Sequence, residues 1–360
     1  MVNQVTKNAF EAFGFNSETA KIYPYGEGHI NTTFKVDSPD GVYILQKVNT
    51  NVFPAVKEMM HNVSSVTEFL RKKISARGGD AERETMNFYK TVDGEWLYND
   101  GEGGMWRLCR FVNDSVCLQS PRNEEDFLQS GVAFGKFLCD LADFPAETLY
   151  EVIARFHDTP NRFEAFEKAL EQNLSNRRDT CEEEINFLLS QKDFTRTLKD
   201  ANLPLRVTHN DTKLNNVLLS SDYKALCVID LDTIMPGYAV TDFGDSIRFG
   251  ASTAAEDEKD LSKVNLSLSR FEAYAKGYIG QCKNALTEKE LELMPEGAMM
   301  MTIECGMRFL TDYLNGDTYF KTAYPEHNLV RAKTQLKLYK EMQKNLDEMH
   351  NIINKIVKEG

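Results

Sequence analysis

The chain has 360 residues, which is long for a single hydrophobic core and favours two lobes. Its formal net charge of −13 argues against nucleic acid and anionic membranes as partners, because binding either usually requires a basic surface. No apolar run approaches the length of a membrane span, and the first residues lack the pattern of a signal peptide, so we expect a cytoplasmic protein. Seven scattered cysteines favour neither a disulfide framework nor structural zinc.

The N-terminal third is predicted to be mainly β. A helix over residues 1–20 comes first, and a second one over 54–74 has apolar residues at helical spacing. The expected strands and turns lie within residues 25–36, 42–48 and 84–112. Gly26 and Gly28 fall in the first turn, where glycine lets backbone N–H groups approach a phosphate, although a plain hairpin turn has the same pattern.

The rest of the chain is predicted to be mostly helical. Helices are expected over residues 124–143, 161–175, 181–200, 267–284, 287–315 and 329–357. The last of these carries apolar residues at spacings of three and four. It is either a terminal helix packed on its own lobe or a short coiled-coil seam, so we expect a monomer or a weak dimer.

Two short apolar runs between residues 207 and 230 each lead into polar residues. Asp211 and Asn216 follow the first run, and Asp230 ends the second, so we expect the three side chains to lie near one another. Phosphoryl transfer needs a carboxylate to accept a proton from the attacking hydroxyl, and oxygen ligands to hold Mg²⁺ on the phosphates. Asp211 suits the first task, and Asn216 with Asp230 suits the second. The alternative is that the aspartates are ordinary turn and strand-end residues.

The pattern His-x-Asp-x-x-x-x-Asn from His209 to Asn216, followed by an apolar strand ending in Asp230, resembles the aminoglycoside phosphotransferase and choline kinase-like families. These are relatives of the protein kinases. The resemblance implies a two-lobed, protein-kinase-like α+β fold, with a small, mainly β N-terminal lobe (residues 1–112) and a larger, mainly helical C-terminal lobe (residues 113–360). It also implies ATP as phosphate donor, Mg²⁺ as cofactor and a small-molecule acceptor.

The resemblance further implies a set of nucleotide-binding residues in the N-terminal lobe: Gly26, Gly28, Asn31, Thr32, Gln46, Arg110 and Val112. Kinase-like proteins usually place a phosphate-binding lysine in the strand at 42–48. By strand register that position is Gln46, with Lys47 on the opposite face. Either a local bulge presents Lys47, or Gln46 serves as a neutral substitute.

The triplet Asp242-Phe243-Gly244 looks like the metal-binding triplet of protein kinases, but its spacing from Asp211 favours another role. Asp230 follows Asp211 by nineteen residues, close to the kinase spacing of about twenty. In the resembling families a later Asp braces the catalytic loop, so we assign Asp242 to structure and Asp230 to metal. Asp232 either points toward the same metal or hydrogen-bonds the turn.

Several longer runs are similar to the bacterial N-acetylhexosamine 1-kinases, a family that also has Gln at the position of Gln46. These runs are residues 25–33, 206–216, 229–237, 242–253, 304–310 and 324–331. The similarity implies an enzyme that phosphorylates an alcohol, the anomeric C1 hydroxyl of N-acetylglucosamine or N-acetylgalactosamine, to give the sugar 1-phosphate. The residues it implies for sugar binding are His29, Asp245, Phe249 and Arg308. Alternatively, His29 only braces its loop, and Asp245 pairs with Arg308 as a structural ion pair.

Three other functions stay open on the sequence alone. A choline, homoserine or aminoglycoside kinase would share the catalytic residues, and a cationic acceptor would need an aromatic and acidic pocket. A non-catalytic nucleotide-binding scaffold is a second possibility, although Asp211 is present. A glycoside hydrolase with paired carboxylates, such as Asp230 and Asp232, would leave the glycines and Asn216 unexplained.

Overall fold

The structure, a computed structural model, describes residues 2–26 and 30–359 and has two compact units. The first unit comprises the residues as far as Cys117 together with Asp140–Ala154 and Val217–Pro236. The second comprises Leu118–Cys139, Arg155–Asn216 and the residues from Gly237 onward. Most of the strands lie in the first unit and most of the helices in the second, so the expected α+β class is confirmed.

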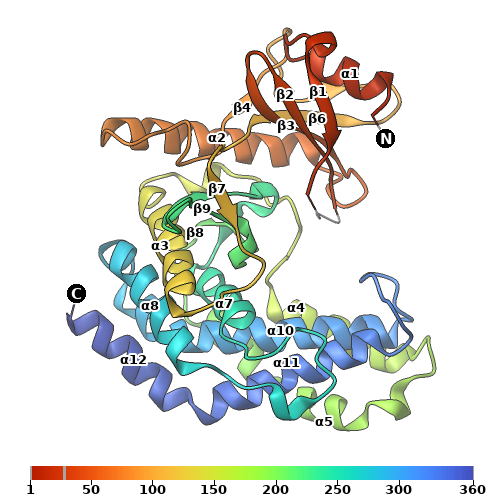
Figure 1. Ribbon diagram of the computed structural model, residues 1–360. Coiled ribbons are helices and arrows are strands. Elements are labelled where there is room, and N and C mark those ends of the chain that lie inside the picture. The colour runs from red at the N-terminus through yellow and green to blue at the C-terminus, as the bar shows by residue number, and fades with distance from the viewer. Residues whose placement is uncertain (1, 27–29, 360) are drawn as a thin grey trace. The chain divides into compact units, whose positions relative to one another are not determined.

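The first unit is built on an antiparallel sheet in the order β1-β2-β3-β6-β4, with β5 paired to β6 (Figure 1). Its strands are β1 (Lys21–Pro24), β2 (Thr32–Ser38), β3 (Gly41–Val48), β4 (Phe88–Tyr89), β5 (Tyr98–Asn99) and β6 (Met105–Arg110). Side chains alternate across a strand, so Trp106 and Leu108 lie on one face and Arg107 and Cys109 on the other.

Helix α1 (Gln4–Glu11) covers the face that carries Trp106. Its apolar residues belong to one buried cluster with the sheet, whose members are Ala9, Phe10, Phe13, Phe34, Val36, Tyr43, Leu45, Trp106 and Leu108. The second helix, α2 (Val56–Ala76), buries the apolar stripe predicted from the sequence, and its Met59 contacts Arg107 on the opposite face. The sheet is therefore packed on both faces.

Asn62 joins the separate stretches of the first unit. It lies on α2 with no exposed surface, and its amide nitrogen donates to the carbonyl oxygens of Tyr150 and Ile234 at 2.8 and 2.9 Å. The Tyr150 N–H donates back to Asn62 Oδ1 at 2.9 Å. Residues 140–154 and 217–236 are thereby tied to α2. A second sheet of this unit has the order β10-β9-β7, and its strands are β7 (Ser115–Cys117), β9 (Val217–Ser220) and β10 (Ala225–Val228).

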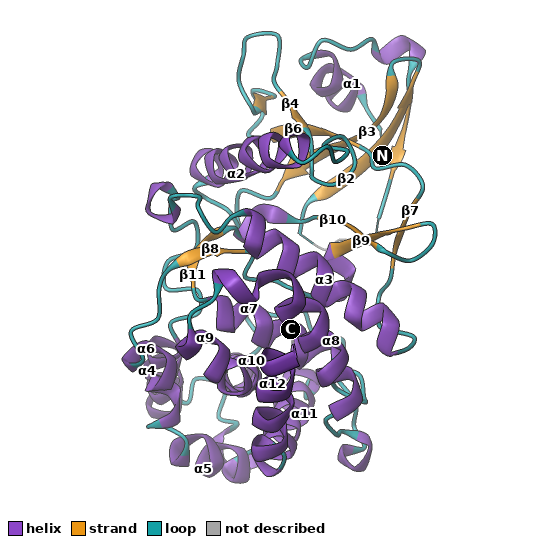
Figure 2. Ribbon diagram, turned by 90° about the vertical axis from the view of Figure 1, so that its left-hand side faces the viewer, coloured by secondary structure: helices purple, strands orange, loops and turns teal. Residues whose placement is uncertain are grey.

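The second unit is a set of helices gathered around α10 (Figure 2). Its helices are α3 (Glu124–Asp140), α4 (Thr159–Gln172), α5 (Glu182–Ser190), α6 (Thr197–Asp200), α7 (Ala239–Gly250), α8 (Leu268–Cys282), α9 (Glu288–Glu292), α10 (Met294–Leu314), α11 (His327–Lys344) and α12 (Leu346–Glu359). Strand β8 (Arg206–Thr208) and the 3₁₀ turn η5 (Leu214–Asn216) also belong to this unit, whereas strand β11 (Met235–Gly237) spans the point in the sequence where the first unit ends. None of the helices in residues 2–26 and 30–359 is both long and apolar enough to cross a bilayer.

Glycines let helices in this unit approach closely. A Cβ built on Gly131 or Gly135 of α3 would lie 2.3 or 2.4 Å from the carbonyl oxygens of Tyr274 and Tyr278 on α8. A Cβ on Gly277 would meet the Leu128 carbonyl at 2.2 Å. Only residues without a Cβ fit at these three positions.

Several helices differ from the sequence prediction. The one expected over residues 1–20 is only Gln4–Glu11, and those expected over 181–200 and 287–315 are divided into α5 and α6 and into α9 and α10. Helix α7 was not predicted, although Asp242, Asp245 and Ser246 recur at helical spacing, because it is rich in the weak helix formers Gly, Thr, Ser and Asp. The helix predicted over 329–357 is interrupted at Asn345, which ends α11 with a non-helical backbone before α12 begins.

Candidate active site

The loop of residues 208–216, which the sequence predicts to be the catalytic loop, is held by α7. Both carboxylate oxygens of Asp242 accept main-chain hydrogen bonds, from the His209 N–H at 2.7 Å and the Asn210 N–H at 2.8 Å. Asn210 has a φ of 63°, in the left-handed region, and these bonds help to keep it there. Burial raises the pKa of Asp242 to about 6, although His209 and the two N–H groups oppose the rise. Asp242 thus braces the loop, as interpreted from the sequence.

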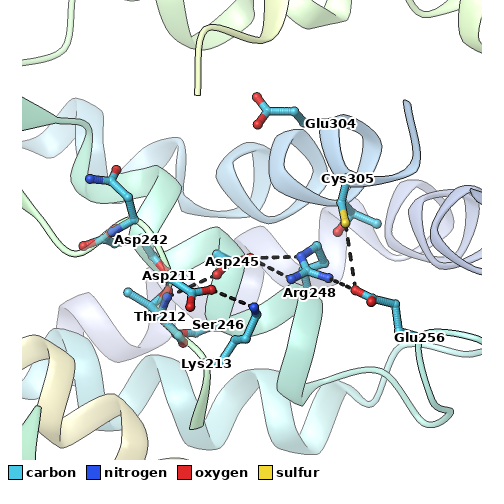
Figure 3. A network of polar contacts seen from close by, with 12 residues as sticks. Asp211, Thr212, Lys213, Asp242, Asp245, Ser246, Arg248, Glu256, Glu304 and Cys305 are labelled. Atoms are coloured by element: carbon cyan, nitrogen blue, oxygen red, sulfur yellow. Dashed lines mark hydrogen bonds and ion pairs between the residues drawn. The ribbon is translucent and has the colours of Figure 1, made fainter. Parts of the chain in front are cut away.

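Asp211 and Asn216 meet within this loop. The amide nitrogen of Asn216 donates to the Asp211 carbonyl oxygen at 2.8 Å and to its carboxylate Oδ2 at 3.0 Å. Lys213 Nζ lies 2.7 Å from the other carboxylate oxygen (Figure 3). Burial would raise the pKa of Asp211, but Lys213, His209 and Asn216 hold it below its usual value. Asp211 is therefore ionised at neutral pH, and its side chain is 31% exposed.

Asp245, one turn after Asp242 on α7, also supports the loop. Its Oδ2 accepts from the Thr212 N–H at 3.1 Å, and its Oδ1 accepts from Arg248 at 2.9 Å. Arg248 in turn pairs with Glu256 at 2.9 Å (Figure 3). The ion-pair partner of Asp245 is thus Arg248, its neighbour on the helix, rather than Arg308.

Arg308 lies on α10 between two aromatic rings. The guanidinium carbon is 5.5 Å from the centroid of Phe156 and 5.6 Å from that of Phe320. Phe320 belongs to a loop whose main chain is bound by Asp312 of the same helix: the N–H groups of residues 318, 319 and 320 donate to the Asp312 carboxylate at 2.8–2.9 Å. Phe249, the apolar wall suggested by resemblance, is half-buried near the end of α7.

Gln46 lies on the same face of the first unit's sheet as the buried side chain of Arg107. It faces Arg107 across β3 and β6, and its Oε1 accepts from Arg107 Nε at 3.0 Å while its Nε2 donates to Thr33 Oγ1 at 3.1 Å. The register of β3 is regular. Lys47 lies on the opposite face, near Trp106 and 3.5 Å from Asp100. No bulge presents Lys47, so the first of the two sequence alternatives is wrong. The role of Gln46 as a neutral substitute for the lysine stays a prediction.

Asp232 is bound by protein groups on both carboxylate oxygens. Arg107 Nη1 lies 2.5 Å from Oδ1, and Asn31 Nδ2 donates to Oδ2 at 2.7 Å. Burial lowers the pKa of Arg107, but Asp232 more than offsets this, so the guanidinium stays charged. The sequence left Asp232 undecided between metal and turn. In the structure it neutralises Arg107.

Asp230 directly precedes the short 3₁₀ helix η6 (Leu231–Thr233) of the first unit. It has φ 60° and ψ 57°, a left-handed conformation that Asp tolerates better than most residues. Asp211 and Asn216 belong to the second unit, and the structure brings these two together as the sequence predicted. Asp230 is placed by the first unit, next to the Arg107–Asp232 pair.

The remaining predicted nucleotide residues all belong to the first unit. Gly26 has a φ of +80°, which favours glycine, whereas Gly28 and His29 lie outside the described residues. Thr32 is exposed at the start of β2. Arg110 pairs with Glu82 at the surface, and the Val112 carbonyl accepts from the Ser115 hydroxyl at 2.7 Å.

The two side chains predicted to bind Mg²⁺, Asn216 in the second unit and Asp230 in the first, each carry oxygen donors of the kind that a hard cation prefers. Asn216 uses its amide nitrogen for Asp211, which leaves its amide oxygen as the ligand atom, and Asp230 supplies a carboxylate. Among the described residues, no group of three or more His, Cys, Asp or Glu side chains could hold a metal ion alone.

Sequence reasoning missed four residues with strong contacts near these groups: Lys213, His157, Glu304 and Arg107. Lys213 was visible in the motif, two residues after Asp211. The others have partners more than a hundred residues away along the chain, so no local pattern indicates them.

The family model described as the phosphotransferase enzyme family (APH) matches residues 21–263. This is more than half of the chain, so the protein belongs to this phosphotransferase family.

Solved structures with the same fold include three kinases of small molecules. A microcompartment-associated aminopropanol kinase is 13% identical, with a TM-score of 0.62 over 96% of this chain and 98% of that one. Spectinomycin phosphotransferase APH(9)-Ia, in complex with ADP and spectinomycin, is 12% identical, with a TM-score of 0.57 over 96% and 98%. Choline kinase from Cryptosporidium parvum Iowa II is 13% identical, with a TM-score of 0.54 over 95% and 94%. At this low identity the likeness establishes a kinase-like fold.

Proposed function

We propose that this protein is an ATP- and Mg²⁺-dependent kinase that phosphorylates the anomeric C1 hydroxyl of an N-acetylhexosamine, N-acetylglucosamine or N-acetylgalactosamine. The observation that carries the kinase assignment is the Asp211 carboxylate, ionised and held by Asn216 and Lys213 in a loop braced by Asp242. The sugar assignment is supported by the runs similar to N-acetylhexosamine 1-kinases.

In this reaction the C1 oxygen attacks the γ-phosphorus of ATP and the bond from that phosphorus to the β,γ-bridging oxygen breaks, so that ADP leaves. Asp211 accepts the proton lost by the C1 hydroxyl. Bound Mg²⁺ supplies charge neutralisation on the phosphates, and the residues proposed to hold it are Asn216 and Asp230. The protein contributes mainly position and fixed charge.

The nucleotide role is proposed for residues of the first unit. Gln46 cannot neutralise phosphate charge as a lysine would. It instead accepts a hydrogen bond from Arg107, whose own charge is balanced by Asp232. The proposed nucleotide contacts at Gly26, Gly28, Asn31, Thr32, Arg110 and Val112 rest on the sequence resemblance.

The surroundings of Arg308 favour a neutral sugar over a quaternary ammonium acceptor. Choline-like ligands are bound through the faces of aromatic rings. In the second unit, the rings of Phe156 and Phe320 already face the guanidinium of Arg308. A cationic acceptor there would meet a like charge. A sugar can instead accept hydrogen bonds from Arg308, and we propose His29, Asp245 and Phe249 as its other contacts.

The test is phosphate transfer from ATP with Mg²⁺ to N-acetylglucosamine, N-acetylgalactosamine, glucose, galactose, choline, ethanolamine, homoserine and kanamycin. Products are examined by ³¹P NMR for phosphate on C1, with Asp211→Asn as the matched inactive control. Preferential C1 phosphorylation of the acetylated sugars supports the proposal. Transfer to an amino alcohol or aminoglycoside instead would keep the kinase assignment and refute the sugar.

A further inference from the structure

His157 lies in the second unit between an acidic side chain and the catalytic loop. Its Nδ1 is 2.8 Å from Glu304 Oε1, and its Nε2 is 3.3 Å from the carbonyl oxygen of Asn210, the residue before Asp211. Glu304 has almost no exposed surface, and the His157 side chain is 11% exposed. The imidazole therefore bridges α10 and the catalytic loop out of contact with most of the solvent.

Both neighbours of the ring are acceptors, which determines its protonation. A backbone carbonyl and an ionised carboxylate cannot donate a hydrogen bond. In a neutral imidazole one nitrogen carries a lone pair, and that lone pair would face either Glu304 or the Asn210 carbonyl. Both contacts are favourable only when His157 and Glu304 together carry two protons.

The two protons belong on His157. The second oxygen of Glu304 accepts from the Thr159 hydroxyl at 2.6 Å, which stabilises the carboxylate form. Burial would raise the pKa of Glu304, but His157, Arg308 and Thr159 hold it below its usual value. His157 and Glu304 thus form an imidazolium–carboxylate pair.

Charged groups on other elements both raise and lower the pKa of His157. Burial would lower the pKa of His157, but Glu304 on α10 raises it above the usual value. Arg308, also on α10, opposes this, and Asp245 on α7 adds to it. Asp242 on α7 also interacts electrostatically with His157, which helps to lower the pKa of that carboxyl. On α4, Arg162 lies near both Arg308 and Glu304.

The bond to Asn210 fixes the peptide unit that leads into Asp211. On one side of Asn210, its N–H donates to Asp242 at 2.8 Å. On the other side, its carbonyl faces His157, and the N–H of Asp211 in the same peptide unit donates to His209 Nδ1 at 3.2 Å. The orientation of this peptide is therefore set both by the group that binds its carbonyl and by the group that binds its N–H.

We propose that His157, kept as an imidazolium by Glu304, is a positioning residue that holds the Asn210–Asp211 peptide and thereby aims the Asp211 carboxylate. The inference rests on the proposed role of Asp211 as proton acceptor. His157 does not touch the reacting atoms; it acts through the carbonyl of Asn210.

The charge of His157 is measured by NMR on protein labelled with ¹⁵N-histidine, with the signal assigned by its loss in His157→Asn. We expect both ring nitrogens to be protonated at about pH 7.5, where an ordinary histidine with a pKa of about 6.5 is mostly neutral. In Glu304→Gln the ring should lose its second proton at lower pH. A singly protonated His157 ring in the unaltered protein at this pH overturns the inference.

Two variants separate positioning from packing. The amide of His157→Gln can reach toward the Asn210 carbonyl in place of Nε2, whereas that of His157→Asn can reach toward Glu304 in place of Nδ1. We expect kcat to fall about 10- to 100-fold in the Asn variant, with the KM for ATP little changed, and to recover partly in the Gln variant. Equal kcat in both variants and the unaltered enzyme, per folded molecule, refutes the positioning role.

The pH profile gives a third readout that a packing role would not move. Because the pKa of His157 is raised by its partner, the charged pair is intact at low pH and is lost as the pH rises through the raised value. The unaltered enzyme should therefore lose kcat on the alkaline side, and His157→Gln should lack that limb. An alkaline limb that is unchanged in His157→Gln contradicts the inference.

The outcomes also separate this inference from the proposed function. A neutral His157 in an enzyme that phosphorylates sugars refutes the inference alone. An unaltered protein that transfers phosphate to no acceptor refutes the proposed function, while the NMR titration still decides the charge of His157.

Discussion

The ammonium of Lys213 lies 2.7 Å from the carboxylate of Asp211, two residues earlier in the same loop. Lys213 and the amide of Asn216 hold the pKa of Asp211 below its usual value of about 3.9, despite burial. Such a carboxylate is a weak base. Its proposed contribution therefore comes mainly from its position next to the attacking hydroxyl, because it accepts a proton that becomes acidic late in the transfer.

Lys213→Met should move the acidic limit of activity to higher pH. Removing the ammonium raises the pKa of Asp211, so protonation switches off the acceptor at a higher pH than in the unaltered enzyme. The measurement is kcat/KM against pH, and Lys213→Arg, which keeps the charge, is the control. An acidic limb that stays in place in Lys213→Met would show that the ion pair does not control Asp211.

Asp211→Asn should lower kcat by about 10²- to 10⁴-fold while leaving ATP affinity largely unchanged, because it removes the proton acceptor but keeps the size of the side chain. Steady-state kinetics and nucleotide titration measure the two quantities separately. Turnover within a few-fold of the unaltered enzyme would exclude Asp211 as the acceptor.

Asp230→Ala should impair activity, whereas Asp242→Ala should impair stability. The first removes a proposed Mg²⁺ ligand and should raise the Mg²⁺ concentration needed for activity, or abolish activity, with little change in melting temperature. The second leaves the His209 and Asn210 N–H groups without their acceptor and should mainly lower the melting temperature. If the two phenotypes were exchanged, the choice of metal ligand would be wrong.

Asp232→Asn should destabilise the protein by about 3–5 kcal/mol, because it leaves the buried charge of Arg107 without its partner. Urea unfolding measures this loss. Lys47→Met is the control: it removes a half-exposed lysine from its pair with Asp100 and should cost less than about 1 kcal/mol. Similar losses in both variants would mean that the Arg107–Asp232 pair has no special role in stability.

Gly135→Ala should destabilise the protein by about 1–3 kcal/mol, because its Cβ would lie 2.4 Å from the Tyr278 carbonyl oxygen and push α3 away from α8. Gly280→Ala is the matched control on α8. Nothing lies within 4 Å of a Cβ at that position, and alanine is the better helix former, so this change should be neutral or stabilising. Thermal unfolding compares them, and equal melting temperatures would refute the close-packing argument.

The features that could be predicted from the sequence are those that depend on the spacing of residues close together in the chain. Asp211 and Asn216 are five residues apart, and the loop between them is short enough that the motif alone indicates their contact. The alternation along β3 likewise placed Gln46 and Lys47 on opposite faces.

The contacts that the sequence missed join residues far apart in the chain. His157 meets Glu304, and Arg107 meets Asp232, across more than a hundred residues each, so their proximity arises only from packing. Helix α7 was missed for a different reason. Its Gly, Thr, Ser and Asp residues are weak helix formers, and packing on nearly all sides stabilises it instead.

The carboxylate of Asp312 binds the main chain of the loop after α10, because it accepts hydrogen bonds from three successive N–H groups. The path of this loop therefore depends mainly on its main chain, although both residues 318 and 319 are exposed and the Thr318 hydroxyl adds a longer bond of 3.4 Å to Asp312. Any residue except proline can donate the same hydrogen bonds. This stretch can thus change its surface chemistry by point mutation while its backbone is preserved.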